Sequence, residues 1–213
     1  MRTFAILPVK TFSVAKQRLH EGLEPRPREA LVEAMFTDVL RSLQKTSVDE
    51  ILVVTGSREA RTIAAAHAVR VVTDDETGHN DAAALGVNVA MDAGATRVLL
   101  VPGDCPAVAP SEIDELLLHP AEPPSVLIVP DRAGTGTNAL VLTPPNAMSP
   151  SFGPGSARRH FEIARARGAN VEIVTVPSLA LDIDTPEDLE SLAALPDPRP
   201  PATARLLGRL SRC

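Results

Sequence analysis

The chain has 213 residues, which suits one domain, or one domain with a short appendage, and leaves little room for two full domains. Hydrophobic residues make up 44% and charged residues 23%, so the composition is that of a folded protein with a core and argues against global disorder. Trp and Tyr are absent, only five Phe occur and the net charge is −6, so a broad basic or base-stacking nucleic-acid surface is disfavoured, although one small basic pocket is not.

Short β-branched runs alternate with Ala- and Leu-rich stretches of helical period up to residue 130. The runs predict strands at residues 3–9, 50–55, 69–73, 96–101 and 125–130. The intervening stretches predict helices at residues 27–43, 58–67, 80–93 and 111–118, the second capped by Ser57 and the last by Ser111. Apolar strands separated by helices are typical of a parallel sheet covered on both faces, with ligands beyond the carboxyl ends of its strands.

The remainder of the chain has a different pattern. A strand is predicted at residues 138–143, a helix at 156–167 with Ser156 as its cap, and a strand at 171–176. Residues 181–184 read as a strand end that runs into a helix, with Thr185 as its cap and Pro186 at its first position. We therefore divide the chain into a domain at residues 1–195 and a Pro- and Arg-rich tail, or an arm onto a partner, at residues 196–213.

Cysteine usage and the N-terminus bear on the location of the protein. Cys105 and Cys213 are too few for a disulfide framework or a structural zinc site, and the apolar setting of Cys105 favours a core residue over a nucleophile. The first apolar stretch is too short for a signal peptide or a membrane span. We expect a soluble, cytoplasmic protein that does not bind membranes.

Positive charge is concentrated directly after the first strand. Lysine occurs at only three positions, and two of them, Lys10 and Lys16, lie with Arg18 in this first loop. Such a cluster suits a nucleoside triphosphate, because phosphoryl transfer depends on neutralising and positioning phosphate oxygens. A solvated basic loop is the alternative. Neither a phosphate-binding Gly-x-x-x-x-Gly-Lys-Ser/Thr motif nor Gly-x-Gly-x-x-Gly follows the strand, which argues against a dinucleotide dehydrogenase.

Acidic residues end two other predicted strands. Asp104 closes the fourth strand in a Pro/Gly turn, and Asp182 and Asp184 occupy alternate positions of a later strand end. Adjacent carboxylates are costly unless a cation shares them, so the three residues are candidate ligands for one or two Mg²⁺ ions. Turn-forming aspartates are the alternative.

Two glycine-rich segments are candidate anion sites. Residues 134–137 offer backbone N–H groups and hydroxyls, and Ser156 begins a helix whose first turn carries Arg158 and Arg159. The five histidines show no metal-ligand spacing.

Five motifs in order resemble a known family over residues 4–210. They are residues 8–10 with 15–19, 103–106, 131–138, 152–158 and 181–189. The chain resembles the guanylyltransferases that activate 2-phospholactate or phosphoenolpyruvate in the biosynthesis of the deazaflavin coenzyme F-420, which are relatives of the molybdenum-cofactor guanylyltransferases. One departure is His79, in Gly78-His79-Asn80, where the family pattern has leucine, so the choice of guanine rests on the family and not on a residue that we can identify.

The resemblance implies a three-layer α/β nucleotidyltransferase (Rossmann-like) fold, with a mixed, mainly parallel sheet flanked by helices. It implies catalytic roles for Lys10, Lys16 and Arg18. It also implies nucleotide binding by Pro8, Val9, Lys10, Gly78, Asn80 and Gly103, acid binding by Thr137, Gly153 and Ser156, and magnesium binding by Asp104, Asp182 and Asp184.

The leading hypothesis is transfer of GMP from GTP to the phosphate of a small phosphorylated carboxylic acid, with release of pyrophosphate. Phosphoenolpyruvate is the favoured acceptor, and 2-phospholactate and 3-phosphoglycerate are alternatives. A molybdopterin or sugar-phosphate nucleotidyltransferase is a second hypothesis, although such relatives carry a glycine-rich run in the first loop that this chain lacks. A third is a non-catalytic nucleotide-binding subunit, and a homodimer is possible.

Overall fold

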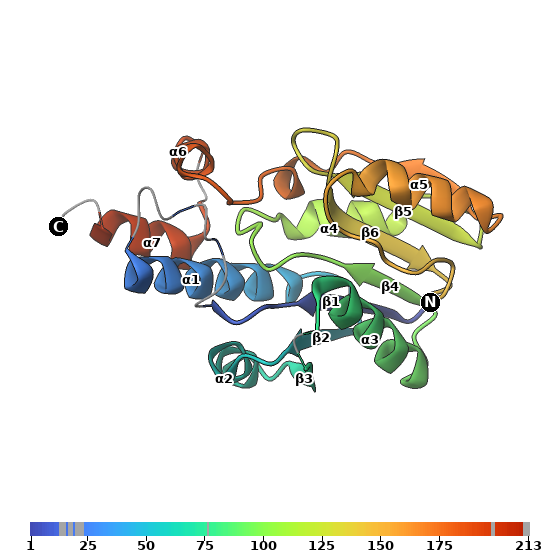
Figure 1. Ribbon diagram of the computed structural model, residues 1–213, viewed down its shortest axis with the longest axis horizontal. Coiled ribbons are helices and arrows are strands. Elements are labelled where there is room, and N and C mark those ends of the chain that lie inside the picture. Colours follow the sequence, from blue (N-terminus) through green and yellow to red (C-terminus); the bar gives the residue numbers. More distant parts are fainter. Residues whose placement is uncertain (13–15, 17–18, 20–23, 76, 197–198, 211–213) are drawn as a thin grey trace.

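Seven strands form one mixed sheet at the centre of the computed structural model, which describes residues 1–12, 16, 19, 24–75, 77–196 and 199–210 (Figure 1). The strands are β1 (Thr3–Pro8), β2 (Glu50–Thr55), β3 (Arg70–Thr73), β4 (Arg97–Leu100), β5 (Ser125–Pro130), β6 (Thr137–Thr143) and β7 (Asn170–Ile173). Their order is β3-β2-β1-β4-β6-β5-β7, and β6 runs antiparallel to both of its neighbours. The other adjacent pairs are parallel, as predicted for a mixed, mainly parallel sheet.

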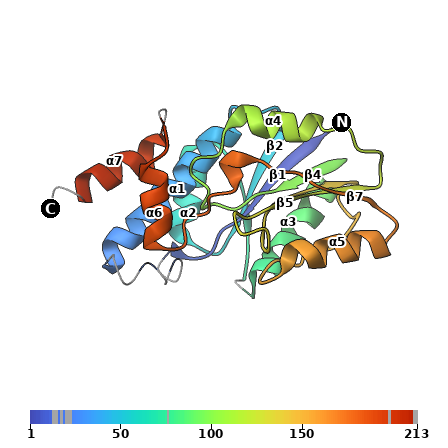
Figure 2. The same ribbon diagram turned by 90° about the horizontal axis from the view of Figure 1, so that it is seen from above.

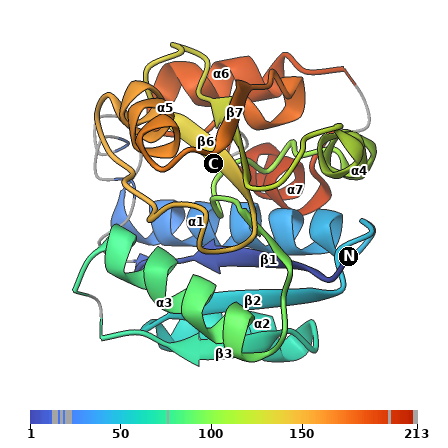
Figure 3. The same ribbon diagram turned by 90° about the vertical axis from the view of Figure 1, so that its right-hand side faces the viewer.

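Helices cover both faces of this sheet, so the predicted three-layer architecture is confirmed (Figure 2). The helices are α1 (Pro25–Leu43), α2 (Arg58–Ala66), α3 (His79–Asp92), α4 (Pro110–Leu118), α5 (Ser156–Ala166), α6 (Pro186–Ala193) and α7 (Pro201–Leu210). Helices α1, α2 and α4 pack on one face, and α3 and α5 pack on the other, as the end-on view in Figure 3 also shows.

The alternation of side chains along β1 explains how one strand serves both layers. Its six residues are all buried. Ala5 and Leu7 join the core under α1, whereas Phe4 and Ile6 join the core under α3, because successive strand residues point to opposite faces. Gly86 lets α3 lie close to the sheet, since a Cβ at this position would come within 2.9 Å of the Val54 side chain.

The C-terminal segment that the sequence predicts as a tail contains a helix. Helix α7 lies alongside α1 (Figures 1 and 2). The buried carboxylate of Asp38 on α1 accepts hydrogen bonds from the backbone N–H groups of Ala202 (2.9 Å) and Thr203 (2.8 Å) and from the Thr203 hydroxyl. An acidic group at these otherwise unpaired N–H groups stabilises the first turn of α7.

Several local predictions differ from the structure. The predicted caps Ser111 and Ser156 lie inside their helices, whose cap positions are held by Ala109 and Gly155. Residues 181–184 form no strand, and they are joined to the strand-end loop by one backbone bond instead of a ladder. Thr185 does cap its helix, with a capping box that includes Asp188. None of the described helices is both long and apolar enough to cross a membrane.

Candidate active site

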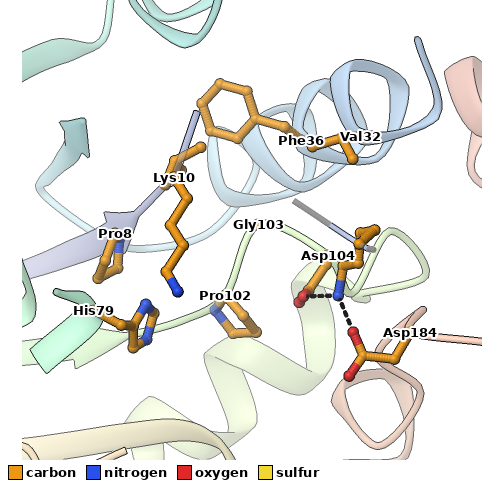
Figure 4. Close-up of a pocket in the computed structure, with 11 residues that line it drawn as sticks. Pro8, Lys10, Val32, Phe36, His79, Pro102, Gly103, Asp104 and Asp184 are labelled. Carbon is orange, nitrogen blue, oxygen red and sulfur yellow. Dashed lines mark hydrogen bonds and ion pairs between the residues drawn. The ribbon is translucent and has the colours of Figure 1, made fainter. Parts of the chain in front are cut away.

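A cavity of about 290 Å³ opens at the carboxyl ends of β1 and β4 (Figure 4). The Val101 N–H donates to the Ile6 carbonyl (3.0 Å), which holds the start of the loop after β4 beside the last residues of β1. The cavity is lined by Pro8, Val9, Lys10, Lys16, Val32, Phe36, His79, Pro102, Gly103, Asp104 and Asp184. Residues from five separate segments therefore meet where a doubly wound sheet binds its ligands.

At one side of this cavity, the Lys16 ammonium bridges two carboxylates. It donates to Asp104 Oδ2 and to Asp184 Oδ1 (2.5 Å). Burial by itself lowers the pKa of Lys16, but the charges of Asp104 and Asp184, with the hydrogen bonds that they accept, outweigh it and raise that pKa above its usual value. The cation thus stays charged while almost buried, with 10% of its side chain exposed.

Asp184 reaches this position because the start of α6 is tied down. The Asp188 carboxylate accepts from the backbone N–H groups of Asp184 (3.1 Å) and Thr185 (2.9 Å). The Ile183 N–H donates to the Asp104 carbonyl (3.1 Å) while its side chain is buried in the core. Two segments about eighty residues apart in sequence are therefore joined at the backbone next to their carboxylates.

Asp182 lies near this cluster but does not line the cavity. Its Oδ1 accepts from Asn138 Nδ2 (3.2 Å). Burial raises the pKa of Asp182, and the charge of Asp104 raises it further.

The donor set partly matches a magnesium site. Among the described residues, no group of three His, Cys, Asp or Glu side chains has an arrangement that could hold a metal ion. Asp104 Oδ1 is nevertheless buried without a hydrogen-bond partner, and its other oxygen converges with Asp184 on one cation position. Mg²⁺ commonly binds through one or two carboxylates, with water and substrate phosphates as its other ligands. Asp104 and Asp184 fit that pattern. Magnesium binding by Asp104, Asp182 and Asp184 stays a prediction.

Lys10 extends into the cavity from the end of β1, towards His79 (Figure 4). Burial lowers the pKa of His79 and the charge of Lys10 lowers it further, against the opposing effect of Asp104, so the imidazole is neutral at pH 7. A second cavity of about 200 Å³ shares Pro8, Val9, Lys10 and His79 with the first and is also lined by Asp74, Gly78 and Ala82. The two cavities thus adjoin along Lys10 and His79.

Asn80 is predicted to bind nucleotide, but its amide already has protein partners. Its Nδ2 donates to the Phe152 carbonyl (3.2 Å), and its Oδ1 accepts from the Phe152 N–H (2.6 Å). Arg159 holds the same loop from the other side, through the carbonyls of Ser151 and Pro154. The loop before α5 is therefore clamped between α3 and α5. Arg159 is not a free anion-binding group.

The three residues predicted to bind the acid lie together around this loop, outside the cavity that Lys16 lines. Thr137 Oγ1 contacts Ser156 Oγ (3.0 Å) and His160 Nδ1 (3.0 Å). Gly153 follows Phe152 with φ +119°, a backbone conformation that side chains rarely adopt. Asn138, next to Thr137, bonds Asp182 and so connects this group to the carboxylates.

Other predictions for the site have mixed outcomes. Arg18 lies outside the described residues. Arg158 pairs with Glu162 (2.7 Å) on the surface. Cys105 is fully buried, and burial raises the pKa of its thiol, so a core role fits it better than a nucleophilic one.

Val32 and Phe36 line the cavity, although nothing in the sequence marks them for that role. They lie one turn apart on the apolar face of α1, where cavity lining and core packing give the same pattern. No sequence signal marks His160 either, because it has no metal-ligand spacing and its partners become neighbours only in the fold.

The fold is one that solved nucleotidyltransferases share. A protein from Desulfovibrio desulfuricans G20, described as a "putative nucleotide-diphospho-sugar transferase", superposes with a TM-score of 0.79 at 17% identity, covering 100% of this chain and 96% of that one. The model of the family described as "Guanylyl transferase CofC like" matches residues 3–195. The chain belongs to this family.

Curated relatives extend the similarity over nearly the whole length. A phosphoenolpyruvate guanylyltransferase from Conexibacter woesei is 46% identical over 100% of this chain and 96% of its own. A 2-phospho-L-lactate guanylyltransferase from Methanothermobacter thermautotrophicus is 37% identical, over 89% of this chain and 83% of its own. A 3-phospho-D-glycerate guanylyltransferase from Colwellia psychrerythraea is 35% identical, over 93% and 94% respectively.

Proposed function

We propose that this protein transfers GMP from GTP to the phosphate of phosphoenolpyruvate, releasing pyrophosphate, as a step in biosynthesis of the deazaflavin coenzyme F-420. The observation that carries the proposal is the convergence of Lys10, Lys16, Asp104 and Asp184 on one cavity in a chain of this family. Phosphoenolpyruvate is the preferred acceptor because the relative with 46% identity is named for it. GTP and phosphorylated acids are intracellular metabolites, so we place the reaction in the cytoplasm.

The chemistry needs no nucleophile from the protein. An oxygen of the acid's phosphate attacks the α-phosphorus of GTP, a new P–O bond forms, and the bond to the α,β-bridging oxygen breaks. Pyrophosphate leaves with the electron pair, and the dianionic attacking phosphate has no proton to lose. The protein's contribution is to position the reactants and stabilise negative charge, which Lys10 and Lys16 supply from the cavity wall.

Asp104 and Asp184 are the residues that would hold Mg²⁺, with Asp182 as a further candidate beside them. The ion would supply charge neutralisation between the phosphates of the two substrates. Lys16 would then balance the carboxylates from one side while it contacts phosphate on the other. This arrangement accounts for a cation held so close to two acidic side chains.

The second cavity supports guanine as the base. Guanine presents N–H donors at N1 and N2 on its Watson–Crick edge, whereas adenine has an acceptor at N1 and no amino group at C2. The Asp74 carboxylate, which lines this cavity, can accept both guanine donors. Asp74 therefore takes over the base-selecting task for which the Gly78-His79-Asn80 segment gives no residue.

The test is direct. The protein is incubated with GTP, Mg²⁺ and each of the three candidate acids, and pyrophosphate release is followed together with the mass of the product. We expect turnover with at least one acid, and highest kcat/KM with phosphoenolpyruvate. Highest activity with 3-phosphoglycerate or 2-phospholactate would reassign the acceptor. Absence of pyrophosphate with all three acids would remove the proposal.

A further inference from the structure

His160 has a defined tautomer because one of its partners can only donate. The ring is fully buried. The backbone N–H of Ser151 points at Nε2 (2.8 Å), so Nε2 must accept and carries no proton. The proton of the neutral ring is then on Nδ1, which donates to Thr137 Oγ1 at 3.0 Å.

This tautomer determines how the two hydroxyls beside it are used. Thr137 and Ser156 bring two hydroxyl protons and share one hydrogen bond between them (3.0 Å). Because His160 fills an acceptor position on Thr137, that bond uses one proton and leaves the other to donate outwards. The described residues offer no acceptor for the remaining proton. The pair therefore presents one O–H donor, which suits an acceptor-only anion.

The clamp on the loop argues against a purely structural role for His160. Ser151 and Pro154 are held by Arg159, and Phe152 is held at both its N–H and its carbonyl by Asn80. The loop therefore has anchors that do not involve the imidazole. Burial and the charge of Arg159 lower the pKa of His160 to about 4, so the neutral form persists at pH 7.

We propose that His160 is a positioning residue that orients the Thr137–Ser156 hydroxyl pair to donate a hydrogen bond to an anionic oxygen of the acid substrate. The inference rests on the proposed function. It adds a residue that does not touch the substrate itself and acts through Thr137. A carboxylate or a phosphate oxygen has the same chemistry at this point, and the experiment distinguishes the two.

The first arm compares His160→Phe, which keeps a planar ring beside Phe152, with His160→Asn, whose amide nitrogen can replace the Nδ1–H donor. We expect His160→Phe to raise the KM for the acid about tenfold, the effect of one poorly aligned hydrogen bond to a charged group, and to leave the KM for GTP within about twofold. His160→Asn should recover most of the loss. Equal increases in both KM values, or no recovery with Asn, would overturn the proposal.

The second arm asks whether His160 acts through Thr137. In a Thr137→Val background the hydroxyl is gone, so adding His160→Phe should raise the acid KM no further. Additive effects of the two substitutions contradict the proposal. Inhibition by ethyl phosphate, which lacks a carboxylate, identifies which oxygen of the acid accepts the hydrogen bond. An unchanged inhibition constant in His160→Phe assigns the carboxylate, and an inhibition constant about tenfold higher assigns the phosphate. Taken with the loss of acid binding in the first arm, either result supports the hydroxyl pair as donor.

A measurement on the wild-type protein tests the role of His160 independently of the proposed function. Nitrogen-15 NMR of His160 should show a protonated Nδ1 and an unprotonated Nε2 at pH 7, with or without catalytic activity. The opposite tautomer, or a charged ring, would refute the positioning role even in an active enzyme. The expected tautomer in a protein with no turnover on any acid would instead count against the proposed function alone.

Discussion

The two halves of the sheet use polar side chains in opposite ways. Around β1 and β4 the site consists of full charges, with Lys10 reaching into the cavity without an ion pair to any described residue and Lys16 shared by two carboxylates. Around β6 and α5 the side chains predicted to bind the acid are uncharged, with Thr137 and His160 bonded to each other. The first arrangement suits phosphates that carry several charges, and the second suits the orientation of one small acid. The comparison predicts different consequences for substitutions in each half.

Lys16→Ala should have the largest effect. It removes the cation between Asp104 and Asp184, so that two carboxylates face the phosphates without compensation. We expect kcat to fall by about 10²- to 10³-fold, which is typical for the loss of one group that stabilises transition-state charge. Steady-state pyrophosphate release measures it. Lys45→Ala, in the exposed turn after α1, is the matched control and should leave kcat unchanged. Equal activity of the two variants would show that the charged half is not the catalytic half.

Asp104→Asn should have the next largest effect. The substitution keeps the size of the side chain but removes a charge from the site where we expect Mg²⁺. We expect a loss of about 10²-fold in kcat/KM at fixed Mg²⁺ and a higher Mg²⁺ concentration for half-maximal rate. Titration of activity with MgCl₂ measures both, with the surface variant Asp92→Asn as control. A loss of rate with an unchanged Mg²⁺ requirement would assign Asp104 to holding Lys16 alone.

The sequence was more informative about the charged half than about the uncharged half. Lys10 and Asp104 follow predicted strands that the structure confirms, and residues at the carboxyl ends of parallel strands meet at one edge of the sheet. Asp184 ends a predicted strand that does not form, and the backbone bond from Ile183 to Asp104 brings it to the same edge. Hydrophobic periodicity likewise predicts the layers, because burial on both faces makes whole strands apolar. These inferences depend on local pattern and on topology, which a single sequence carries.

The uncharged half depends on contacts between distant segments. Nothing local marks His160 as a partner of Thr137, or Asn80 as a clamp on Phe152, since both relations arise only when α5 and α3 pack on the sheet. The same holds for α7, whose docking depends on the buried Asp38 of α1. Its segment is rich in Pro and Arg, and composition alone indicated a tail.

The pH dependence of folding stability tests whether the buried ring of His160 in the uncharged half is neutral. The pKa of His160 is about 4 in the fold and about 6.5 in an unfolded chain, so the unfolded state binds the proton more readily. The neutral imidazole therefore contributes its full stability above pH 6.5, and this is lost as the pH falls from 6.5 to 4. Between pH 6.5 and pH 4 we expect the free energy of unfolding of the His160→Phe variant to fall by about 1 to 3 kcal/mol less than that of the wild-type protein. Urea unfolding across this pH range measures both. Parallel curves for the two proteins would contradict a neutral buried ring.

The smallest effect that we expect concerns the choice of nucleotide base. For this choice the charged half of the site has to distinguish guanine from adenine as well as bind phosphate. Asp74→Asn exchanges one acceptor oxygen for an amide NH₂ group. One of the two hydrogen bonds proposed for guanine is then lost, and an amide N–H faces a guanine N–H. We expect the preference for GTP over ATP, as a ratio of kcat/KM, to fall about tenfold, since one mispaired hydrogen bond costs about 1 to 2 kcal/mol. Asp75→Asn, one residue further on and exposed, is the matched control and should leave the ratio unchanged. If both variants kept the ratio, the choice of guanine would have to come from backbone groups around the second cavity and not from a carboxylate.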